Sequence, residues 1–167
     1  MKQENKMPEI FIKDSATVAK ALLGKVLCHK LSDGKVIKLR ITETEAYYYK
    51  EDCCYKGIGK GTVLKSVGYL CDYYQMLLIS CNNSEHSDNV LIRAGEFLEN
   101  NGETVFFDKP IILRNRFLSQ EHITAEDLTS SGKIWIDNLE DADCKCCCHR
   151  RVNTKDDREL RFCLQKK

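Results

Sequence analysis

The sequence predicts a single mixed α/β domain, and two local patterns give the first evidence for it. Residues 15–24 combine a polar start, an apolar stripe and a final glycine, which is typical of a helix that Ser15 caps and Gly24 ends. Residues 25–49 are strand-like on both sides of the dipeptide Asp33-Gly34, a frequent turn in two-stranded hairpins. A helix followed by a hairpin indicates that both kinds of element contribute to the fold.

Apolar segments of strand length continue this pattern. Residues 69–81 predict a strand, or a short helix running into a strand. Residues 88–98 and 132–138 predict two more strands, the first with Arg93 at its end. The glycine-rich stretch 57–68 predicts a loop. It lacks the GxxxxGK[ST] spacing of a P-loop, and no apolar strand leads directly into it as a dinucleotide site requires.

The chain is long enough for one domain with its own core. It has 167 residues, of which 43% are hydrophobic and 31% charged, as in globular rather than disordered proteins. We expect one domain over residues 1–167, with residues 1–8 and 164–167 frayed. No apolar run approaches the roughly 20 residues that span a bilayer, so we expect no membrane segment.

The ten cysteines are expected to be free thiols. The first ten residues are polar and lack the apolar core of a secretory signal. This predicts an intracellular protein, cytoplasmic or, in a eukaryote, nuclear, in a reducing compartment. Adjacent cysteines, at 53–54 and 146–148, are also poorly suited to a disulfide framework.

Charge is distributed unevenly, although the formal net charge is only +1. Residues 13–40 hold seven cationic and two acidic side chains, and residues 144–167 hold eight and three. Residues 121–143 are strongly acidic. The two basic segments could form a face for a polyanion, or they could be scattered solubilising charge.

The stretch "LRITETEAYYYKEDCC", residues 39–54, carries an unusual polar pattern. On a strand, side chains repeat every second residue, so Ile41, Glu43, Glu45 and Tyr47 would share one face, together with the next tyrosine in the same series. Two carboxylates and two aromatic rings on one face fit an exposed edge strand with strand-forming tyrosines. Such a face is unusual both for a protein core and for an ordinary surface.

Two motifs resemble those of the alkyladenine (3-methyladenine) DNA glycosylase family. They are "RITETEAY" at Arg40–Tyr47 and "VLIRA" at Val90–Ala94, and "VAKALLGKVL" at 18–27 is similar to the family's opening helix and first strand. The resemblance covers roughly residues 15–162. It implies an antiparallel curved β-sheet core flanked by helices.

The resemblance also implies a function in base-excision repair. Members of the family hydrolyse the N-glycosidic bond of an alkylated purine, such as 3-methyladenine, that is flipped out of duplex DNA. The damaged base is released, and the reaction builds oxocarbenium character on the sugar. The implied partner is duplex DNA containing alkylated purines. No cofactor and no metal are implied, and we expect a monomer.

The resemblance assigns the catalytic and base-binding residues. By position in the motif, Glu45 would activate the attacking water, and a carboxylate there would also stabilise the developing cation. Arg93 would hold that water or the target phosphate. Tyr47 would stack on the extruded base, where an aromatic face suits a cationic alkylated purine. The first glutamate of the pair, Glu43, is expected to be structural.

The resemblance places further substrate contacts in the tyrosine-rich segment. Tyr73 is expected in the base pocket, and Tyr74 is expected to be the wedge that fills the gap left by the flipped nucleotide. If the register differs, the wedge is to be sought at Met76 or in the loop before Gly68. Both tyrosines could also be ordinary strand residues.

The sequence departs from the family pattern after the first motif. The family has a water-positioning histidine shortly after Glu-Asp, but "EDCCYKG" at 51–57 contains none. Cys54, Tyr55 or Lys56 could replace it, or the distant His86. This departure leaves open a catalytically impaired relative that only binds DNA.

A cysteine-rich segment suggests a different function. "CKCCCHRR" at 144–151 contains thiols and an imidazole, which are zinc ligands, and Cys144 with Cys147 has C-x₂-C spacing. Four ligands within six residues could not surround one ion without strain. A small zinc-binding interaction module built on residues 144–149 is therefore the second alternative function, after the impaired relative. The segment could also be a cysteine-rich loop near basic residues.

Overall fold

The computed structural model describes residues 9–55, 66–82, 86–130, 132–137 and 145–165. A short 3₁₀ helix, η1 (Glu9–Ile12), precedes two α-helices, α1 (Ser15–Leu22) and α3 (Pro110–Leu118). The strands are β1 (Val26–Lys30), β2 (Val36–Tyr47), β3 (Tyr69–Tyr73), β4 (Met76–Cys81), β5 (Asp88–Leu98), β6 (Thr104–Phe107), β7 (Ala125–Asp127), β8 (Ile134–Asp137), β9 (Cys146–His149) and β10 (Arg161–Leu164). None of the helices in these ranges is long and apolar enough to cross a membrane.

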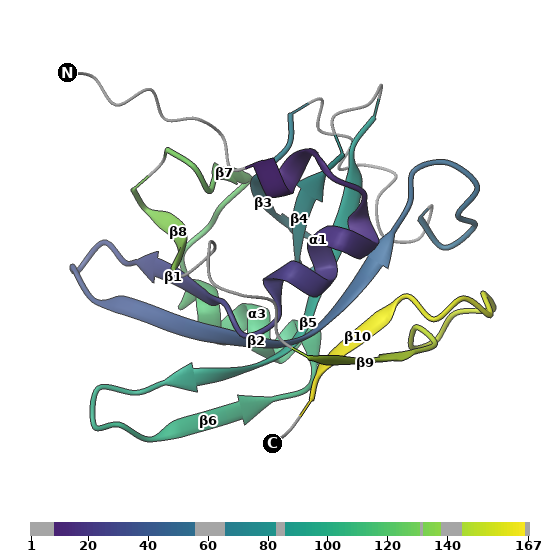
Figure 1. Ribbon diagram of the computed structural model, residues 1–167. Helices are drawn as coiled ribbons and strands as arrows, with labels where there is room; N and C mark the ends of the chain where they lie inside the picture. The colour runs from purple at the N-terminus through teal and green to yellow at the C-terminus, as the bar shows by residue number, and fades with distance from the viewer. Residues whose placement is uncertain (1–8, 56–65, 83–85, 131, 138–144, 166–167) are drawn as a thin grey trace.

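The predicted mixed α/β class is wrong, because the fold is mainly β. The strands form one 10-stranded sheet, all of whose pairings are antiparallel (Figure 1). Seven strands follow the order β7-β3-β4-β5-β2-β1-β8, and off this path β6 pairs with β5, β10 with β2, and β9 with β10. The end strands β7 and β8 contact each other, so the sheet nearly closes into a barrel. The described helices are only 8 and 9 residues long and do not form a flanking layer.

Asp14, rather than the predicted Ser15, caps helix α1. Its carboxylate accepts hydrogen bonds from the backbone amides of Ala16 and Thr17, at 3.1 and 3.2 Å. Ser15 is instead the first helical residue and is fully buried. Aspartate is as good a cap as serine, so the sequence pattern could not separate two adjacent candidates.

The predicted hairpin around Asp33-Gly34 is confirmed. β1 pairs with β2, with Lys30 opposite Val36, and Gly34 has a φ of +88°. The Asp33 carboxylate accepts a hydrogen bond from the amide of Lys35 at 2.9 Å. Contacts among the turn residues themselves therefore stabilise the turn.

A β-bulge changes the predicted alternation of β2. The pairing with β5 shifts between Ile41 and Glu43 and again between Glu43 and Thr44. Ile41 and Ala46 consequently both lie in the main core, although strict alternation places them on opposite faces. Glu43, Glu45 and Tyr47 remain on the other face. The bulge thus lets one strand contribute to the core at both ends and present its acidic residues elsewhere.

The segment 69–81 is a tight hairpin rather than a single strand or a helix and a strand. Tyr73 of β3 pairs with Met76 of β4, so Tyr74 and Gln75 form a two-residue turn. Both have positive φ angles, +47° and +59°, as in the turns that match strand twist. The turn lifts Tyr74 out of the sheet, and 71% of its surface is exposed.

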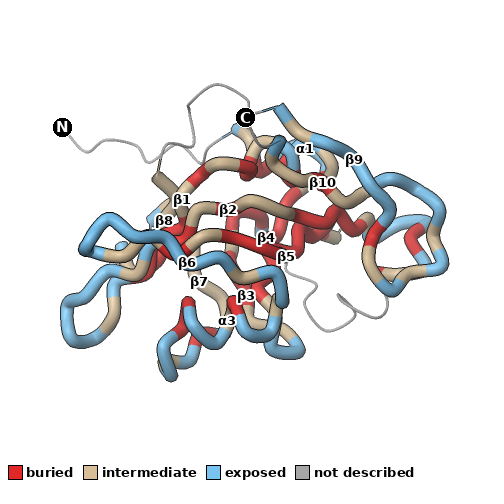
Figure 2. Tube along the Cα trace, turned by 90° about the horizontal axis from the view of Figure 1, so that it is seen from below, coloured by how far each residue is buried: buried red, intermediate tan, exposed pale blue. Residues whose placement is uncertain are grey.

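Buried residues concentrate along β2, β4 and β5 (Figure 2). The main core joins α1, α3 and the inner face of the sheet. A second cluster consists of Tyr47, Tyr55, Leu78 and Leu91. It lies on the face of β2 that carries Glu45, so the candidate site has its own apolar support.

The C-terminal hairpin completes the sheet beside β2. β10 pairs with β2, with Arg161 opposite Glu45, and its other edge pairs with β9 (Figure 1). Leu164 still pairs with Cys146, so the strand continues into the segment that was expected to fray. Residues 1–8 lie outside the described ranges. The hairpin brings residues far apart in the sequence next to Glu45.

Candidate active site

Glu45 lies at the centre of the site. Its side chain is buried, with 2% of the surface exposed, and both carboxylate oxygens accept hydrogen bonds. The Tyr47 hydroxyl donates to Oε2 at 2.6 Å, and the backbone amide of Val152 donates to Oε1 at 2.8 Å. Because these donors come from two distant parts of the chain, they fix the carboxylate in one orientation.

Arg93 converges on Glu45 from β5. It lies in the middle of that strand rather than at its predicted end. Its Nε is 3.8 Å from Oε1 of Glu45 and 3.0 Å from Oε1 of Glu43. Arg161 Nη1 donates to the same oxygen of Glu43 at 3.0 Å. Glu43 therefore holds two arginines beside Glu45, which agrees with a structural task, and Glu45 and Arg93 are within reach of one water molecule.

Tyr47 is enclosed by protein. Its surface is 1% exposed, and the guanidinium of Arg151 lies 4.5 Å from the centre of its ring. Burial, and then the charge of Glu45, raise the pKa of the Tyr47 hydroxyl, which keeps it protonated as a donor. A base stacked on Tyr47 would need the ring face away from Arg151. Stacking remains a prediction, whereas the hydrogen bond to Glu45 gives Tyr47 an additional task.

Arg151 is a site residue that the sequence analysis missed. Its side chain is fully buried and donates to both oxygens of Asp52, at 2.7 and 3.0 Å. It also donates to the carbonyl of Ala46 at 3.0 Å and to Asp156 at 2.9 Å. This cluster anchors the C-terminal segment over the ring of Tyr47. Its only sequence signal is the pair of arginines that ends the cysteine-rich segment.

Asp52 is the matching acid of this cluster. Burial alone would raise its pKa, but the hydrogen bonds from Arg151 and from the amides of Tyr48 and Cys54 outweigh burial and hold the pKa below its ordinary value. Arg151 responds in the opposite direction, because Asp52 offsets the effect of burial and raises the pKa of the guanidinium. Both groups therefore stay charged.

The predicted pocket and wedge tyrosines are neighbours at the hairpin, where Tyr73 ends β3 and Tyr74 begins the turn. Tyr74 is exposed at the tip, and Tyr73 is half-buried against the second apolar cluster, as is Met76. The two tyrosine rings meet edge to face at 4.4 Å. Asp72, just before them, is bound by two nitrogens of Arg114 on α3, which ties the hairpin to that helix. Of the three predicted contacts in this hairpin, Tyr74 is the one with the exposure that a wedge requires.

The residues that could replace the family's water-positioning histidine do not lie together beside Glu45. Tyr55 is buried, donates to the carbonyl of Ser87 at 3.0 Å and accepts from Asn89 at 3.1 Å. The ring of His86 lies 4.1 Å from that of Tyr49. Cys54 packs against the second apolar cluster, and Lys56 lies outside the described residues. The cation that lies over the ring of Tyr47 is instead Arg151.

Metal ligation fits poorly at both cysteine-rich places. On β9, successive residues point to opposite faces, so Cys146, Cys147 and Cys148 cannot surround one ion. Cys144 lies outside the described residues. In the part of the chain that is described, one group of four potential ligands lies close together, and it comprises Asp52, Cys53, Cys54 and Asp156. Asp52 already binds Arg151 through both oxygens, so a metal would have to displace the guanidinium.

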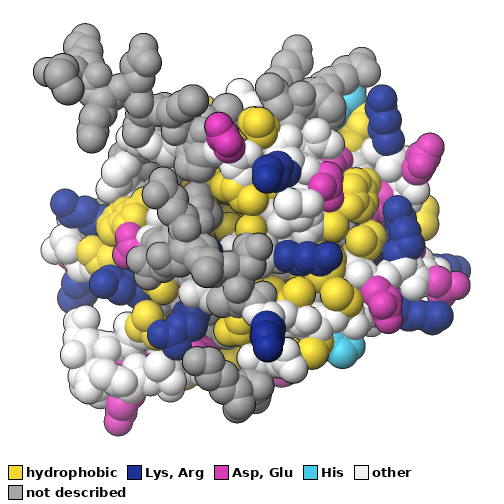
Figure 3. Space-filling model, viewed as in Figure 1, with side chains coloured by type: hydrophobic (Ala, Val, Ile, Leu, Met, Phe, Trp, Pro, Cys, Tyr) yellow, Lys and Arg dark blue, Asp and Glu magenta, His cyan; other side chains and the backbone are white. Residues whose placement is uncertain are grey.

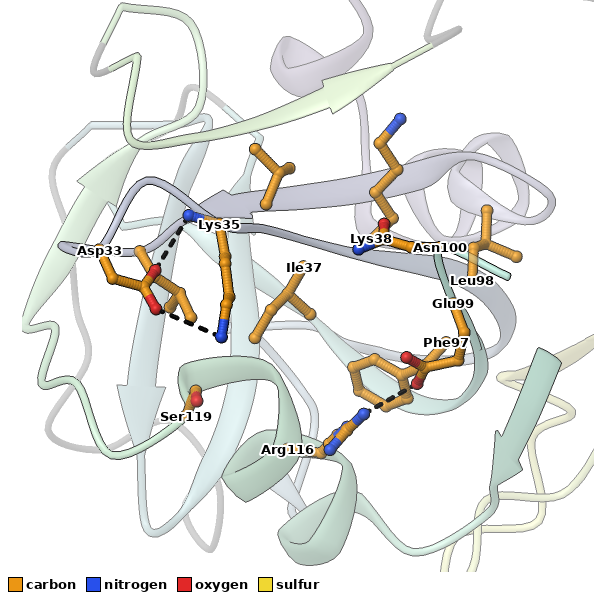
Figure 4. A pocket seen from close by; sticks show the side chains of 12 residues that line it. Asp33, Lys35, Ile37, Lys38, Phe97, Leu98, Glu99, Asn100, Arg116 and Ser119 are labelled. Carbon is orange, nitrogen blue, oxygen red and sulfur yellow. Dashed lines mark hydrogen bonds and ion pairs between the residues drawn. The ribbon is translucent and has the colours of Figure 1, made fainter. Parts of the chain in front are cut away.

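A groove of about 490 Å³ lies away from these residues, between the turn of the first hairpin, the end of β5 and α3 (Figure 4). Four of its charged side chains pair with each other, Lys35 with Asp33 at 3.6 Å and Arg116 with Glu99 at 2.8 Å. None of the predicted site residues lines it. The groove therefore adds nothing to the site around Glu45.

The two basic segments do not form one patch on the visible face. Lysines and arginines are spread among apolar and acidic side chains there (Figure 3). In the C-terminal segment, four arginines take part in internal ion pairs: Arg150 with Asp157, Arg151 with Asp52, Arg158 with Asp156 and Arg161 with Glu43. Much of this positive charge is therefore already paired within the protein, although the pair of Arg150 and Asp157 is exposed.

Comparisons with known proteins agree with the two motifs. The methylpurine-DNA glycosylase family profile matches residues 9–106. A Psychrobacter cryohalolentis protein named for 3-methyladenine DNA glycosylase activity is 32% identical over 142 residues, which cover 76% of this chain and 64% of that protein. This chain thus spans less than two thirds of that relative.

Two other relatives are matched over more of their length. A Natranaerobius thermophilus protein with the same name is 30% identical over 151 residues, covering 77% of this chain and 76% of the relative. An Encephalitozoon cuniculi protein named for DNA-3-methyladenine glycosylase activity is 28% identical over 176 residues, covering 89% and 84%. The family predicted from Arg40–Tyr47 and Val90–Ala94 is confirmed, and the chain belongs to the methylpurine-DNA glycosylase family.

Proposed function

We propose that the protein is a monofunctional DNA glycosylase that removes alkylated purines of the 3-methyladenine type from duplex DNA. The observation that carries the proposal is the arrangement of Glu45 and Arg93. A buried carboxylate, held by a hydroxyl and a backbone amide, has a guanidinium nitrogen 3.8 Å away. Family membership and the names of the relatives support the same reaction class.

In this proposal Glu45 takes a proton from the attacking water, which adds to C1′ as the bond to the base breaks. Its negative charge also stabilises the oxocarbenium-like sugar. Arg93 orients the water or the adjacent phosphate. Tyr47 and Val152 keep the carboxylate aimed at the sugar. Because Glu45 and Tyr47 are buried, the extruded nucleotide must open the site as it enters.

The substrate would be reached by base flipping. Duplex DNA hides C1′ and the base, so the nucleotide must leave the stack before hydrolysis. Tyr74 is suited to take its place, because it is exposed at the tip of a hairpin that Arg114 ties to α3. Tyr73 and Met76, beneath the tip, would line the passage to the pocket.

The substitution Glu45→Gln tests the proposal. The variant keeps the shape of the side chain and should bind DNA normally, but it cannot act as a base. We expect single-turnover release of 3-methyladenine from a duplex to fall by about 10²–10⁴-fold. Glu96→Gln, on the neighbouring strand, is the matched control and should retain the rate. A Glu45→Gln variant as fast as the wild type would contradict the assignment.

A second candidate function is a relative that binds DNA without excising a base. The burial of Tyr47 under Arg151 favours it, because the ring is closed to a base in this arrangement. One measurement, the release of free base, distinguishes the two functions. Binding to duplex DNA with no release of free base, from either 3-methyladenine or hypoxanthine, identifies the binding protein.

A further inference from the structure

The C-terminal hairpin carries a pair of cysteines for which the proposed function gives no task. Cys147 of β9 lies directly opposite Cys163 of β10, and both thiols are free. Directly opposed residues of antiparallel strands share a face, with Cβ atoms about 4.5–5.5 Å apart. This is slightly wider than the roughly 3.5–4.5 Å between the Cβ atoms of a disulfide, so the two strands must draw together as the bridge closes. The Cα atoms of opposed residues are about 4.5–5.5 Å apart, within the range of about 4.4–6.8 Å found in disulfides.

The other cysteines of β9 do not share this geometry. Because side chains alternate, Cys146 and Cys148 point to the opposite face, as does Phe162, which is buried in the core. Cys147 is exposed, and Cys163 is half-buried. Of the three cysteines on β9, Cys147 is therefore the one placed to meet Cys163.

Cys163 also contacts the active site. It lies opposite Glu43 of β2, on the face that carries Glu45. Burial, and then the charge of Glu43 together with a hydrogen bond to that carboxylate, raise the pKa of the Cys163 thiol to about 11. Glu43 in turn pairs with Arg93 at 3.0 Å. The thiol pair and the predicted catalytic arginine are thus joined through one carboxylate.

We infer that Cys147 and Cys163 are a thiol–disulfide site, at which a small disulfide such as glutathione disulfide closes a reversible cross-strand bridge that slows base release. The effect on base release rests on the proposed function, whereas the bridge itself does not. Reversible, redox-sensing bridges are the kind found in reducing compartments.

The reaction is a pair of thiol–disulfide exchanges. The exposed Cys147 attacks one sulfur of the oxidant as its thiolate, forms a mixed disulfide and releases one thiol. Cys163 then attacks the sulfur of Cys147 and releases the second thiol. The two protein thiols lose two electrons and two protons, and the oxidant is reduced to two thiols. In the bridged state Cys163 has no hydrogen to donate to Glu43, which changes the support of Arg93.

Peptide mapping tests the bridge without any measurement of activity. The full-length protein is incubated with glutathione disulfide, its remaining thiols are alkylated, and it is digested with trypsin. The bridge joins peptide 146–150 to peptide 162–166, and dithiothreitol separates them. Cys147→Ser and Cys163→Ser should each abolish the joined peptide. Cys148→Ser, on the same strand but the other face, should retain it. A joined peptide that persists in Cys147→Ser, or none in the wild type, overturns the assignment.

Two further measurements test the link to the active site. Oxidised wild-type protein should release base about tenfold more slowly than reduced protein. This is the effect expected from the loss of one hydrogen bond to a charged group. The rate of Cys163→Ser should not respond to the oxidant. Equal rates with a mapped bridge overturn the link. If the reduced protein releases no base, the proposed function fails instead. In that case Glu43→Gln decides the link, because it should move alkylation of Cys163 to lower pH, and an unchanged profile contradicts the contact.

Discussion

Arg151 and Asp52 form a doubly hydrogen-bonded ion pair whose side chains have no exposed surface. The pair links the C-terminal segment to the site, because the guanidinium of Arg151 also lies over the ring of Tyr47. A buried charge that loses its partner is strongly destabilising. The integrity of the site and the stability of the fold therefore depend on the same contact.

Asp52→Asn should lower the free energy of unfolding at neutral pH by about 3 kcal/mol, because it leaves the buried Arg151 short of negative charge. The pKa of Asp52 is held below its ordinary value of 3.8, so the stabilisation is complete above that value and is lost as the pH falls further. Urea unfolding at neutral pH and below pH 3.8 should show the difference between variant and wild type shrinking in acid.

The exposed pair of Asp33 and Lys35 provides the control for that measurement. Asp33→Asn should cost less than about 1 kcal/mol at neutral pH, since exposed ion pairs contribute little. If Asp52→Asn cost no more than Asp33→Asn, the buried pair would not be an important source of stability.

Tyr74→Ala should weaken binding to a duplex with an abasic site by roughly 1–3 kcal/mol, the usual contribution of an aromatic ring stacked on a base. Binding to an intact duplex should change little, because the wedge acts only where a nucleotide has left the stack. The fold should be unaffected, since Tyr74 is 71% exposed. Titrations with both duplexes measure the effect. Phe106→Ala, another exposed aromatic residue, is the control, and equal losses on both duplexes from Tyr74→Ala would reject the wedge.

Gln75→Gly should stabilise the hairpin that carries Tyr74. Gln75 has a φ of +59°, a conformation that costs residues other than glycine about 1–2 kcal/mol. We expect a gain of about 1 kcal/mol in the free energy of unfolding, measured with urea. The reverse change, Gly34→Ala, replaces a glycine with a φ of +88° and should destabilise the first hairpin. A loss of stability in Gln75→Gly would mean that the side chain makes a contact that offsets the backbone strain.

DNA binding should weaken steeply as salt rises, because contacts with phosphates release counterions. Within the C-terminal segment, the internal ion pairs distinguish basic side chains that can face phosphates from those that already bind an acidic residue. The exposed Lys155 can face phosphates, whereas Arg158 is engaged with Asp156. Lys155→Ala should therefore reduce the slope of log Kd against log salt concentration by up to about 1, and Arg158→Ala should reduce it less. The reverse order would show that Arg158 leaves Asp156 when DNA binds.

The first hairpin and the acidic motif could be predicted because their signals are local. Asp33-Gly34 specifies its own turn, and the motif at Arg40–Tyr47 lies on one strand. Tyr74-Gln75 was not recognised as a turn, because neither residue favours a positive φ and the packing around the hairpin imposes it. The bulge was missed for a related reason, since it is defined by the pairing of β2 with β5 rather than by the residues of β2 alone.

The residues that contact Glu45 show more clearly what the sequence alone could not predict. Arg93 and Tyr47 belong to recognisable motifs, and the structure brings both of them to Glu45. Val152 contributes only its backbone amide, which no side-chain pattern records. Arg151 stands in a basic run that is typical of a solvated surface, and its burial depends on Asp52, 99 residues earlier. The predominance of strands was underestimated, because the strands beyond residue 100 are short and carry few strand signals. Helix α3 (Pro110–Leu118) was not predicted either.

The contact between Glu45 and Val152 sets the order in which a newly made molecule matures. A ribosome delivers the amino-terminal part first, so β2 and its glutamate emerge long before the amide that will hold them, 107 residues later. Until the segment that carries Val152 and β10 has been made, the carboxylate lacks the hydrogen bond from that amide and the strand that pairs beside it. Under the proposed function, a nascent chain without the segment that carries Val152 and β10 would therefore lack part of the support that catalysis by Glu45 requires.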